Sequence, residues 1–424
     1  MTQTELITET LASQAAAEVP AAEPVAGWHR GHIPALDGLR GIAILMILFL
    51  HFNQEALLKL HYPLAGPVIT KIAQMGLKGV DLFFVLSGFL ITGILLDTKG
   101  STGFFRKFYA RRVLRIFPLY YGSLLIVFCI VPWVVTLDAP AEAIAREQCW
   151  LWTYLANVPG VSPGWDNSSL FRLGHFWSLC VEEHFYLVWP VIVGACSPRW
   201  LLRICLCLIV TALLAGIANA ILGNRVFWMM RWTTIRYMDA LAIGGLLALI
   251  VRQPGVASRL LPWAKRLVFV FGILFVGLGF VPRAFHQEAI SLLQKSVSTV
   301  LFASILLCVV TASAGSWLGC VLSSRALRTF GKYSYCLYVI HNILLPALNS
   351  IFPPDKLIAA CRIPILGLAA HMVLAIGACF AIAFISWHLF ESQFLKLKRF
   401  FEYQSCRTTA PATLVRELSR TADL

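Results

Sequence analysis

Charged residues are scarce in this sequence, and their scarcity excludes an ordinary water-soluble protein. Only 13% of the 424 residues are charged, whereas a soluble domain has about 25%. Hydrophobic residues make up 58% of the chain, and the mean hydropathy is +0.75. Most of the chain therefore has lipid as its solvent, and no stretch between the apolar segments is long enough to fold separately in water.

The sequence also lacks the short motifs of several enzyme classes. It contains no Gly-x-Ser-x-Gly, His-Glu-x-x-His, P-loop or Gly-x-Gly-x-x-Gly segment. A serine hydrolase, a zinc protease and an ATP-driven machine therefore have no support. The twelve cysteines lack the paired spacing of a zinc site or of a disulfide framework. They indicate small packing residues, and we expect no metal.

Ten apolar segments approach the length of about 20 residues that a membrane span requires. They lie near residues 38–54, 76–96, 116–137, 176–196, 204–222, 235–251, 267–281, 296–313, 333–350 and 364–390. The sequence therefore predicts an all-α membrane protein of about ten transmembrane helices, with one domain at 31–395. Residues 1–30 and 396–424 are expected to be cytoplasmic tails, and the first, rich in Ala, Thr and Glu, is expected to be disordered.

The net charge of +14 follows the connections between these segments. The connections after even-numbered segments, with the C-terminal stretch, hold about twice as many Lys and Arg residues as the others. Because cytoplasmic loops hold the positive excess, both termini are predicted to be cytoplasmic in a multi-pass protein of the cell membrane. The basic residues thus indicate topology and contact with lipid, with no nucleic-acid partner. A homo-oligomer is compatible with the sequence.

Ionisable residues inside the spans are functional candidates, because each costs roughly 2.5 to 3.5 kcal/mol in lipid. In the first span, Arg40 and His51 are eleven positions apart, so they share one helix face about 16 Å apart along it. A snorkelling arginine and an interfacial histidine are the structural alternatives. In the second span, Ser87-Gly88 predicts close helix packing. Asp81, near its outer end, is expected to meet water, Lys78 or the first helix.

Two further segments carry polar side chains on one face. The loop after the second span contains Arg111, Arg112 and Arg115, whose forked guanidinium groups suit phosphate oxygens, although a positive-inside loop would also be basic. In the fourth span, a stripe at spacings of three and four predicts a polar path into an apolar helix, with a buried ion pair as the alternative. The stripe consists of His175, Ser178, Glu182 and Tyr186, while Glu183 and His184 are expected to point elsewhere.

Later spans hold fewer candidates. Arg236 and Asp239 are three residues apart, which favours a structural ion pair. His341 lies mid-span and is equally compatible with a core histidine and with a pocket residue. Glu391 closes the last span and is typical of an anchor at the cytoplasmic surface.

Taken in order, these segments resemble the acyltransferase type 3 family of bacterial membrane acyltransferases. The resemblance rests on Leu36 to Ala43 with His51, Gly79 to Ile91, the Arg-x-x-Arg of 112–115 with Pro118, Trp177 to Tyr186, Arg236 to Gly244, and Tyr335 to His341. The sequence departs from the family pattern at His184, where glutamine is more usual, and at Ile340, where tryptophan is common. Either departure could reshape the acceptor pocket.

The resemblance implies a ten-helix domain that transfers acyl groups, often acetyl, from cytoplasmic acyl-CoA to carbohydrate hydroxyls. It implies that Arg40 and His51 are essential, and that Arg112 and Arg115 correspond to the loop motif. Together with the interpretation of the individual spans, the resemblance predicts three groups of site residues. The catalytic residues are His51, Arg40, Glu182 and Asp81, the cofactor-binding residues are Arg112, Arg115 and Arg111, and the substrate-binding residues are His175, Ser178, Tyr186 and His341.

The mechanism expected from these residues uses His51 as general base on the acceptor hydroxyl, with Glu182 or Asp81 orienting the imidazole. An acyl-imidazole intermediate is an open variant. The alternative from another class is a proton-coupled transporter or flippase for a glycan or anionic solute, in which Arg40, His51 and Glu182 would form a proton relay.

Overall fold

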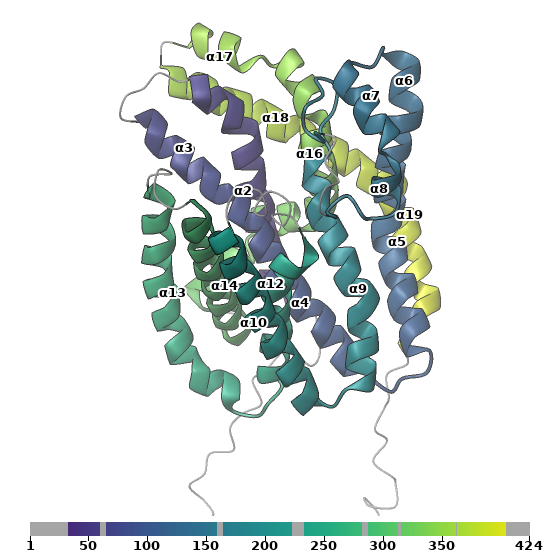
Figure 1. The fold of residues 1–424 in the computed structure, drawn as a ribbon, viewed down its shortest axis with the longest axis vertical. Helices are drawn as coiled ribbons and strands as arrows, with labels where there is room; N and C mark the ends of the chain where they lie inside the picture. The colour runs from purple at the N-terminus through teal and green to yellow at the C-terminus, as the bar shows by residue number, and fades with distance from the viewer. Residues whose placement is uncertain are drawn as a thin grey trace, which may run out of the picture.

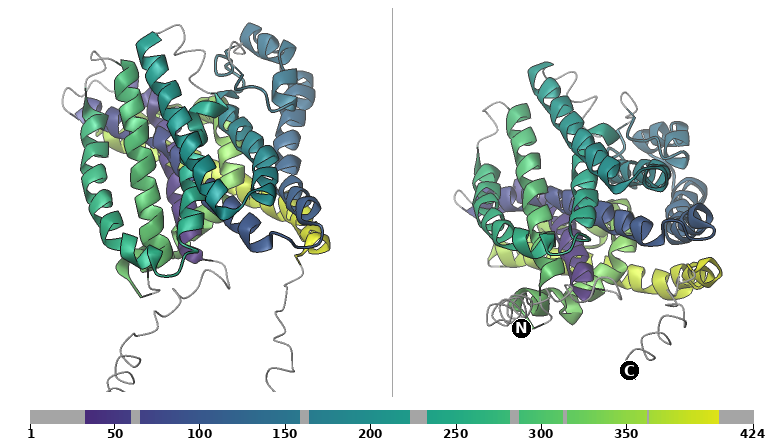
Figure 2. Two further views of the ribbon diagram at one scale, coloured as in Figure 1. Left: turned by 60° about the horizontal axis from the view of Figure 1, so that its bottom comes forward. Right: turned by 90° about the horizontal axis from the view of Figure 1, so that it is seen from below.

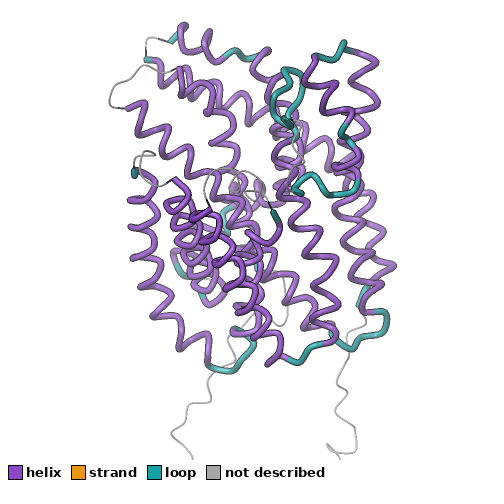
Figure 3. The backbone as a smooth tube through the Cα atoms, in the orientation of Figure 1, coloured by secondary structure: helices purple, strands orange, loops and turns teal. Residues whose placement is uncertain are grey.

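The computed structural model describes residues 33–59, 65–158, 164–222, 233–281, 287–312, 315–361 and 363–403. These residues form helices and connecting loops without a strand (Figure 3). The all-α membrane fold predicted from the sequence is confirmed. The tail expected at 1–30 and most of the tail expected at 396–424 lie outside the described residues.

Nine long helices form the body of the described part of the chain. They are α2 (Pro34–Lys59), α4 (Gly79–Thr98), α5 (Phe104–Leu125), α9 (Trp177–Ala195), α10 (Pro198–Leu222), α12 (Thr234–Ile250), α13 (Val256–Phe280), α14 (Gln287–Thr311) and α16 (Arg325–Ile351), and α18 (Pro364–Ser386) adds a tenth. Shorter elements complete the described chain: α3 (Ala65–Met75), η1 (Gly76–Lys78), η2 (Ile126–Ile130), α6 (Val131–Val134), α7 (Ala139–Arg146), α8 (Cys149–Trp152), η3 (Gly174–Phe176), α15 (Trp317–Leu322), α17 (Pro354–Ala360), η4 (Trp387–Glu391), α19 (Ser392–Lys396) and η5 (Leu397–Phe401).

The described chain begins and ends at the same end of this bundle (Figures 1 and 2). Helix α2 starts there and passes through the middle of the bundle, where it packs against α16, α3 and α4. Helix α4 packs against α12, and α13 lies with α14 at one side. The predicted cytoplasmic location of both termini is compatible with this arrangement and stays a prediction.

Seven helical runs among the described residues are long and apolar enough to cross a membrane, or eight if the pair α16 and α17, bent by 47°, forms one span. Helices α9 and α12 fall outside this set. Helix α12 has only 17 residues, and α9 carries two adjacent glutamates. Both pack against α4 in the bundle, where neighbouring helices replace lipid as their surroundings. The expected total of ten spans therefore stays a prediction.

Glycine lets α4 and α12 approach closely, as Ser87-Gly88 predicted. A Cβ atom on Gly88 would overlap the backbone carbonyl of Leu241, and one on Gly244 would overlap the carbonyl of Val85. Because these atoms belong to the backbone, neither helix can yield by a side-chain rotation. The pair of glycines thus sets the distance between two helices that have no hydrophobic driving force to associate in lipid.

We expect Gly88→Ala to lower the free energy of unfolding by roughly 1–3 kcal/mol, the usual cost of overpacking a filled core. The physical reason is that the new methyl group must push α12 away from α4. Thermal unfolding of the purified protein in detergent measures this effect. Gly272→Ala is the matched control, since a Cβ atom on Gly272 meets nothing within 4 Å; equal melting temperatures for the two variants would contradict the prediction.

Glu391 differs from its expected place at the membrane surface. Its side chain is buried at 8% exposure in η4 and accepts a 3.3 Å hydrogen bond from Ser386. The helical run continues beyond it through α19 and η5, both of which pack against α5. The expected surface anchor is therefore a buried residue, because the helical run continues past it along α5 where the sequence pattern suggested an exit into water.

Candidate active site

A cavity of about 310 Å³ lies between α4, α5, α9 and α16. Its wall is largely apolar, with Phe83, Phe84 and Leu90 from α4. Five cationic side chains also line it: Arg40, Arg111, Arg112, Arg115 and Lys398. Among the described lining residues, only Glu182 and Glu183 are carboxylates. The cavity therefore has an excess of positive charge and is suited to an anionic ligand with an apolar portion.

Arg112 is held in place by aromatic and polar neighbours. Its guanidinium carbon lies 4.9 Å from the centre of the Tyr186 ring, a cation–π distance. The hydroxyl of Tyr186 is 2.6 Å from that of Ser87, so α9 and α4 fix the ring beneath the cation. The Glu182 carboxylate interacts electrostatically with Arg112 and Arg40. The predicted polar stripe thus reaches the cavity, where it contacts the arginines.

Several lining residues were missed by the sequence reading. Glu183 lines the cavity although it was expected to point elsewhere, and Lys398 and Tyr403 reach it from the C-terminal part. Arg111 binds the same part, since its Nη1 donates to the carbonyl of Phe401 at 3.4 Å. Burial raises the pKa of the Tyr403 phenol, which stays protonated. The sequence did not mark residues 398–403 as lining a cavity, because basic residues are expected after the last transmembrane span of any such protein.

Three histidine rings form a cluster outside the cavity wall, which we call the histidine cluster. The ring centres of His51 and His341 are 4.8 Å apart, and those of His341 and His175 are 4.9 Å apart. His341 is fully buried and His175 is 5% exposed. Arg40 and His51 thus lead from the cavity to this cluster along one face of α2, and the structure joins His51 to two of the expected substrate-binding residues.

Ser178 and Tyr338 contact both the cavity and the histidine cluster. Their hydroxyl oxygens are 2.5 Å apart, and both residues line the cavity. Tyr338 also donates a 3.1 Å hydrogen bond to the carbonyl of His175, and its ring lies 5.6 Å from the His341 ring. This hydroxyl pair therefore links the wall of the cationic cavity to His175 and His341 of the histidine cluster.

The connection before α9 contacts α16 at the residue next to His341. Asp166 accepts hydrogen bonds from the backbone amide of Gly174 at 2.8 Å and from the Asn342 side chain at 3.1 Å. A Cβ atom on Gly174 would overlap the Asp166 carboxylate, so the glycine is needed for this contact. Asp166 and Arg172 also act electrostatically on His51. The connection expected at the outer leaflet therefore supplies two charged groups that act on that imidazole.

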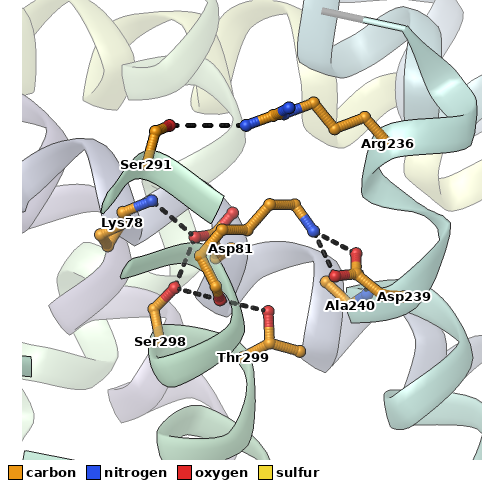
Figure 4. Close-up of polar contacts among 9 residues, drawn as sticks. Lys78, Asp81, Arg236, Asp239, Ala240, Ser291, Ser298 and Thr299 are labelled. Atoms are coloured by element: carbon orange, nitrogen blue, oxygen red, sulfur yellow. Dashed lines mark hydrogen bonds and ion pairs between the residues drawn. The ribbon is translucent and has the colours of Figure 1, made fainter. Parts of the chain in front are cut away.

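Asp81 lies in a different polar group, between α4, α12 and α14 (Figure 4). Its carboxylate is 3.6 Å from Lys78 and accepts a 2.8 Å hydrogen bond from Ser298. Lys295 forms an ion pair with Asp239 in the same group. Among the contacts of the described residues, neither Asp81 nor Glu182 is a partner of His51. Lys295 could not be identified from the sequence as the partner of Asp239, because the two residues lie on separate helices.

The comparison with known sequences decides the family. The acyltransferase domain family matches residues 33–388, which include the cavity, except Lys398 and Tyr403, and the histidine cluster. The chain belongs to the acyltransferase type 3 family. No solved structure matches it. The family expected from the sequence is therefore confirmed, while the roles of individual residues stay proposals.

Two curated members resemble this acyltransferase type 3 protein over 74% of its chain. YrhL of Bacillus subtilis, whose name proposes a peptidoglycan O-acetyltransferase, is 30% identical over 338 residues. The peptidoglycan O-acetyltransferase OatA of Listeria monocytogenes is 28% identical over 337 residues. These matches cover 48% and 49% of the two relatives, so the chain spans about half their length.

Proposed function

We propose that this protein is a membrane O-acyltransferase that moves an acyl group, in the simplest case acetyl, from acyl-CoA to a hydroxyl of a carbohydrate or glycoside. The observation that carries the proposal is the cationic cavity joined through Ser178 and Tyr338 to the histidine cluster. Membership of an acyltransferase family supports acyl transfer, and the names of the relatives support a carbohydrate acceptor.

The cavity is suited to coenzyme A, which combines phosphate groups with a long, largely apolar arm. Arg112 and Arg115 lie at i and i+3 on α5, where two guanidinium forks can bind phosphate oxygens bidentately. Arg111 and Lys398 add charge from the same side. In this proposal the phosphates bind these cations at the predicted cytoplasmic end, and the arm follows the apolar wall past Arg40 towards Ser178.

His51 is suited to act as general base. Its Nδ1 lies 3.0 Å from the carbonyl of Ile47, which can only accept, so Nδ1 carries the proton in this contact. The Nε2 lone pair of the neutral ring then takes the proton of the acceptor hydroxyl while the oxygen attacks the thioester carbonyl. Collapse of the tetrahedral intermediate breaks the C–S bond. The imidazolium returns its proton to the thiolate, which leaves free thiol and an ester.

The test is acceptor-dependent thiol release by the purified full-length protein in lipid vesicles. We expect acetyl-CoA to yield free thiol when methyl hexosides, including methyl β-D-glucopyranoside, or peptidoglycan fragments are added. Mass spectrometry of the acceptor should show one added acetyl group. Protein that binds acetyl-CoA but transfers nothing to this panel, and instead moves a glycan across the vesicle membrane, would replace the enzyme with the transporter alternative.

A further inference from the structure

Hydrogen bonds to the backbone fix which nitrogen of each clustered histidine carries its proton. His341 Nδ1 lies 2.7 Å from the carbonyl of Tyr338, and His175 Nε2 lies 3.0 Å from the carbonyl of Val339. His51 Nδ1 is bound in the same way to Ile47. A carbonyl oxygen accepts and never donates, so each of these nitrogens is the donor. The second nitrogen of each neutral ring is consequently a hydrogen-bond acceptor.

Two of these acceptor nitrogens are buried without a partner in the described part of the chain. They are Nε2 of His341, on a side chain with 0% exposure, and Nδ1 of His175, on a side chain with 5% exposure. Buried polar atoms are normally hydrogen-bonded, because an unsatisfied acceptor loses its hydration without compensation. Both belong to the histidine cluster, in which the His341 ring lies between its contacts with His51 and His175, so a ligand bound there would satisfy them.

The chemistry of the two atoms restricts the ligand. Lone pairs reject carboxylate, phosphate and carbonyl oxygens, which are acceptors themselves, and bind groups that donate a hydrogen bond. A metal ion is the other common ligand of imidazole, but no group of three His, Cys, Asp or Glu residues in the described ranges is placed to hold one. Hydroxyl groups can donate such hydrogen bonds, and a carbohydrate acceptor carries several of them.

We propose that His175 Nδ1 and His341 Nε2 form a hydroxyl-binding subsite, so that the acceptor is a polyol in which hydroxyls neighbouring the acylated one are bound by these two lone pairs. This inference rests on the acyl transfer proposed above. His51 takes the reacting hydroxyl, and the adjacent rings hold its neighbours, since hydroxyls on one sugar ring can reach consecutive rings of the cluster. A simple alcohol lacks these contacts and is a poor acceptor.

Elsewhere in the described chain, His371 is a buried histidine with a similar unpartnered nitrogen that lies outside the histidine cluster. It is also 0% exposed, its Nδ1 is bound to the carbonyl of Phe352 at 2.9 Å, and its Nε2 has no partner among the described residues. It lies on α18, however, and none of its described contacts is with the histidine cluster. His371→Phe is therefore a matched control for His341→Phe and His175→Phe, with the same loss of a buried ring nitrogen.

The experiment compares methyl β-D-glucopyranoside with its 2-, 3-, 4- and 6-deoxy analogues in the thiol-release assay. In the wild-type protein, removal of a hydroxyl beside the acylated one is expected to lower kcat/KM by about 10- to 100-fold, because a buried acceptor nitrogen is then left without its hydrogen bond. His341→Phe or His175→Phe should lower kcat/KM for the parent glucoside to a similar degree, with little further loss on the matching deoxy analogue. His371→Phe should leave the preference unchanged.

The outcomes separate this inference from the function on which it rests. Equal kcat/KM in the wild-type protein for the parent and the three deoxy analogues that keep the acylated hydroxyl overturns the subsite while acyl transfer stands. Equal fractional losses on parent and deoxy substrates in both cluster variants overturn it too, because they show a structural effect. A wild-type protein that binds acetyl-CoA and acylates none of these glucosides or the peptidoglycan fragments overturns the proposed function itself.

Discussion

Replacing His51 with alanine is expected to lower acyl transfer by roughly 10²- to 10⁴-fold, the usual contribution of a general base. Acyl-CoA binding should be almost unchanged, because His51 lies outside the wall of the cationic cavity. The loss should appear in kcat, since the proton is taken in the transition state and not on binding. Steady-state thiol release, with acyl-CoA affinity measured calorimetrically on the same sample, tests both parts.

His388 offers the control for this substitution. Its Nδ1 is bound to the carbonyl four residues earlier, Phe384, at 2.8 Å, which repeats the local contact of His51 with Ile47. His388 is exposed and lies on η4, away from the described histidine cluster. His388→Ala should therefore keep wild-type activity. Near-normal kcat in His51→Ala would remove the general base from the proposed mechanism.

The second large effect is expected from the double substitution Arg112→Ala with Arg115→Ala. Affinity for acyl-CoA should fall by roughly 100-fold or more, because charge-assisted hydrogen bonds to phosphate are among the stronger polar contacts in proteins. KM for acyl-CoA should rise accordingly. Binding of coenzyme A and of dephospho-coenzyme A, measured side by side, shows whether the lost contacts involve the phosphate at the ribose or the pyrophosphate.

Arg106 is the control on the same helix. It is exposed, and the cavity lining does not include it, so Arg106→Ala removes one positive charge from α5 without touching the proposed site. Its acyl-CoA affinity should equal that of the wild type. If Arg106→Ala weakened binding as much as the double variant, the arginines would act through the general charge of the loop, which is the positive-inside alternative.

The link between Arg40 and His51 could be predicted because it is a property of a single helix. Eleven residues at 100° each return to nearly the same face, whatever surrounds the helix. The same reasoning correctly placed Ser178, Glu182 and Tyr186 on the cavity side of α9. It failed for Glu183, because a cavity between several helices can also be lined by the residue that follows Glu182.

Partners on other helices could not be predicted in this way. The mechanism expected from the sequence used Glu182 or Asp81 to orient His51. The described contacts of these carboxylates lie elsewhere, with arginines in one case and with Lys78 and Ser298 in the other. Asp166 contacts Asn342, the residue after His341, only because the connection before α9 packs against α16. Asp166 lies in a loop whose sequence has no periodic pattern from which this contact could be predicted.

The sequence by itself determined that the protein is helical and lies in a membrane, that its family transfers acyl groups, and that Arg40 and His51 share a helix face. Each of these properties depends on local composition or on the geometry of one helix. Only the tertiary structure decided that His51, His175 and His341 meet, and that Lys398 joins the cavity. These contacts depend on how helices far apart in the chain pack, which no single-helix period encodes.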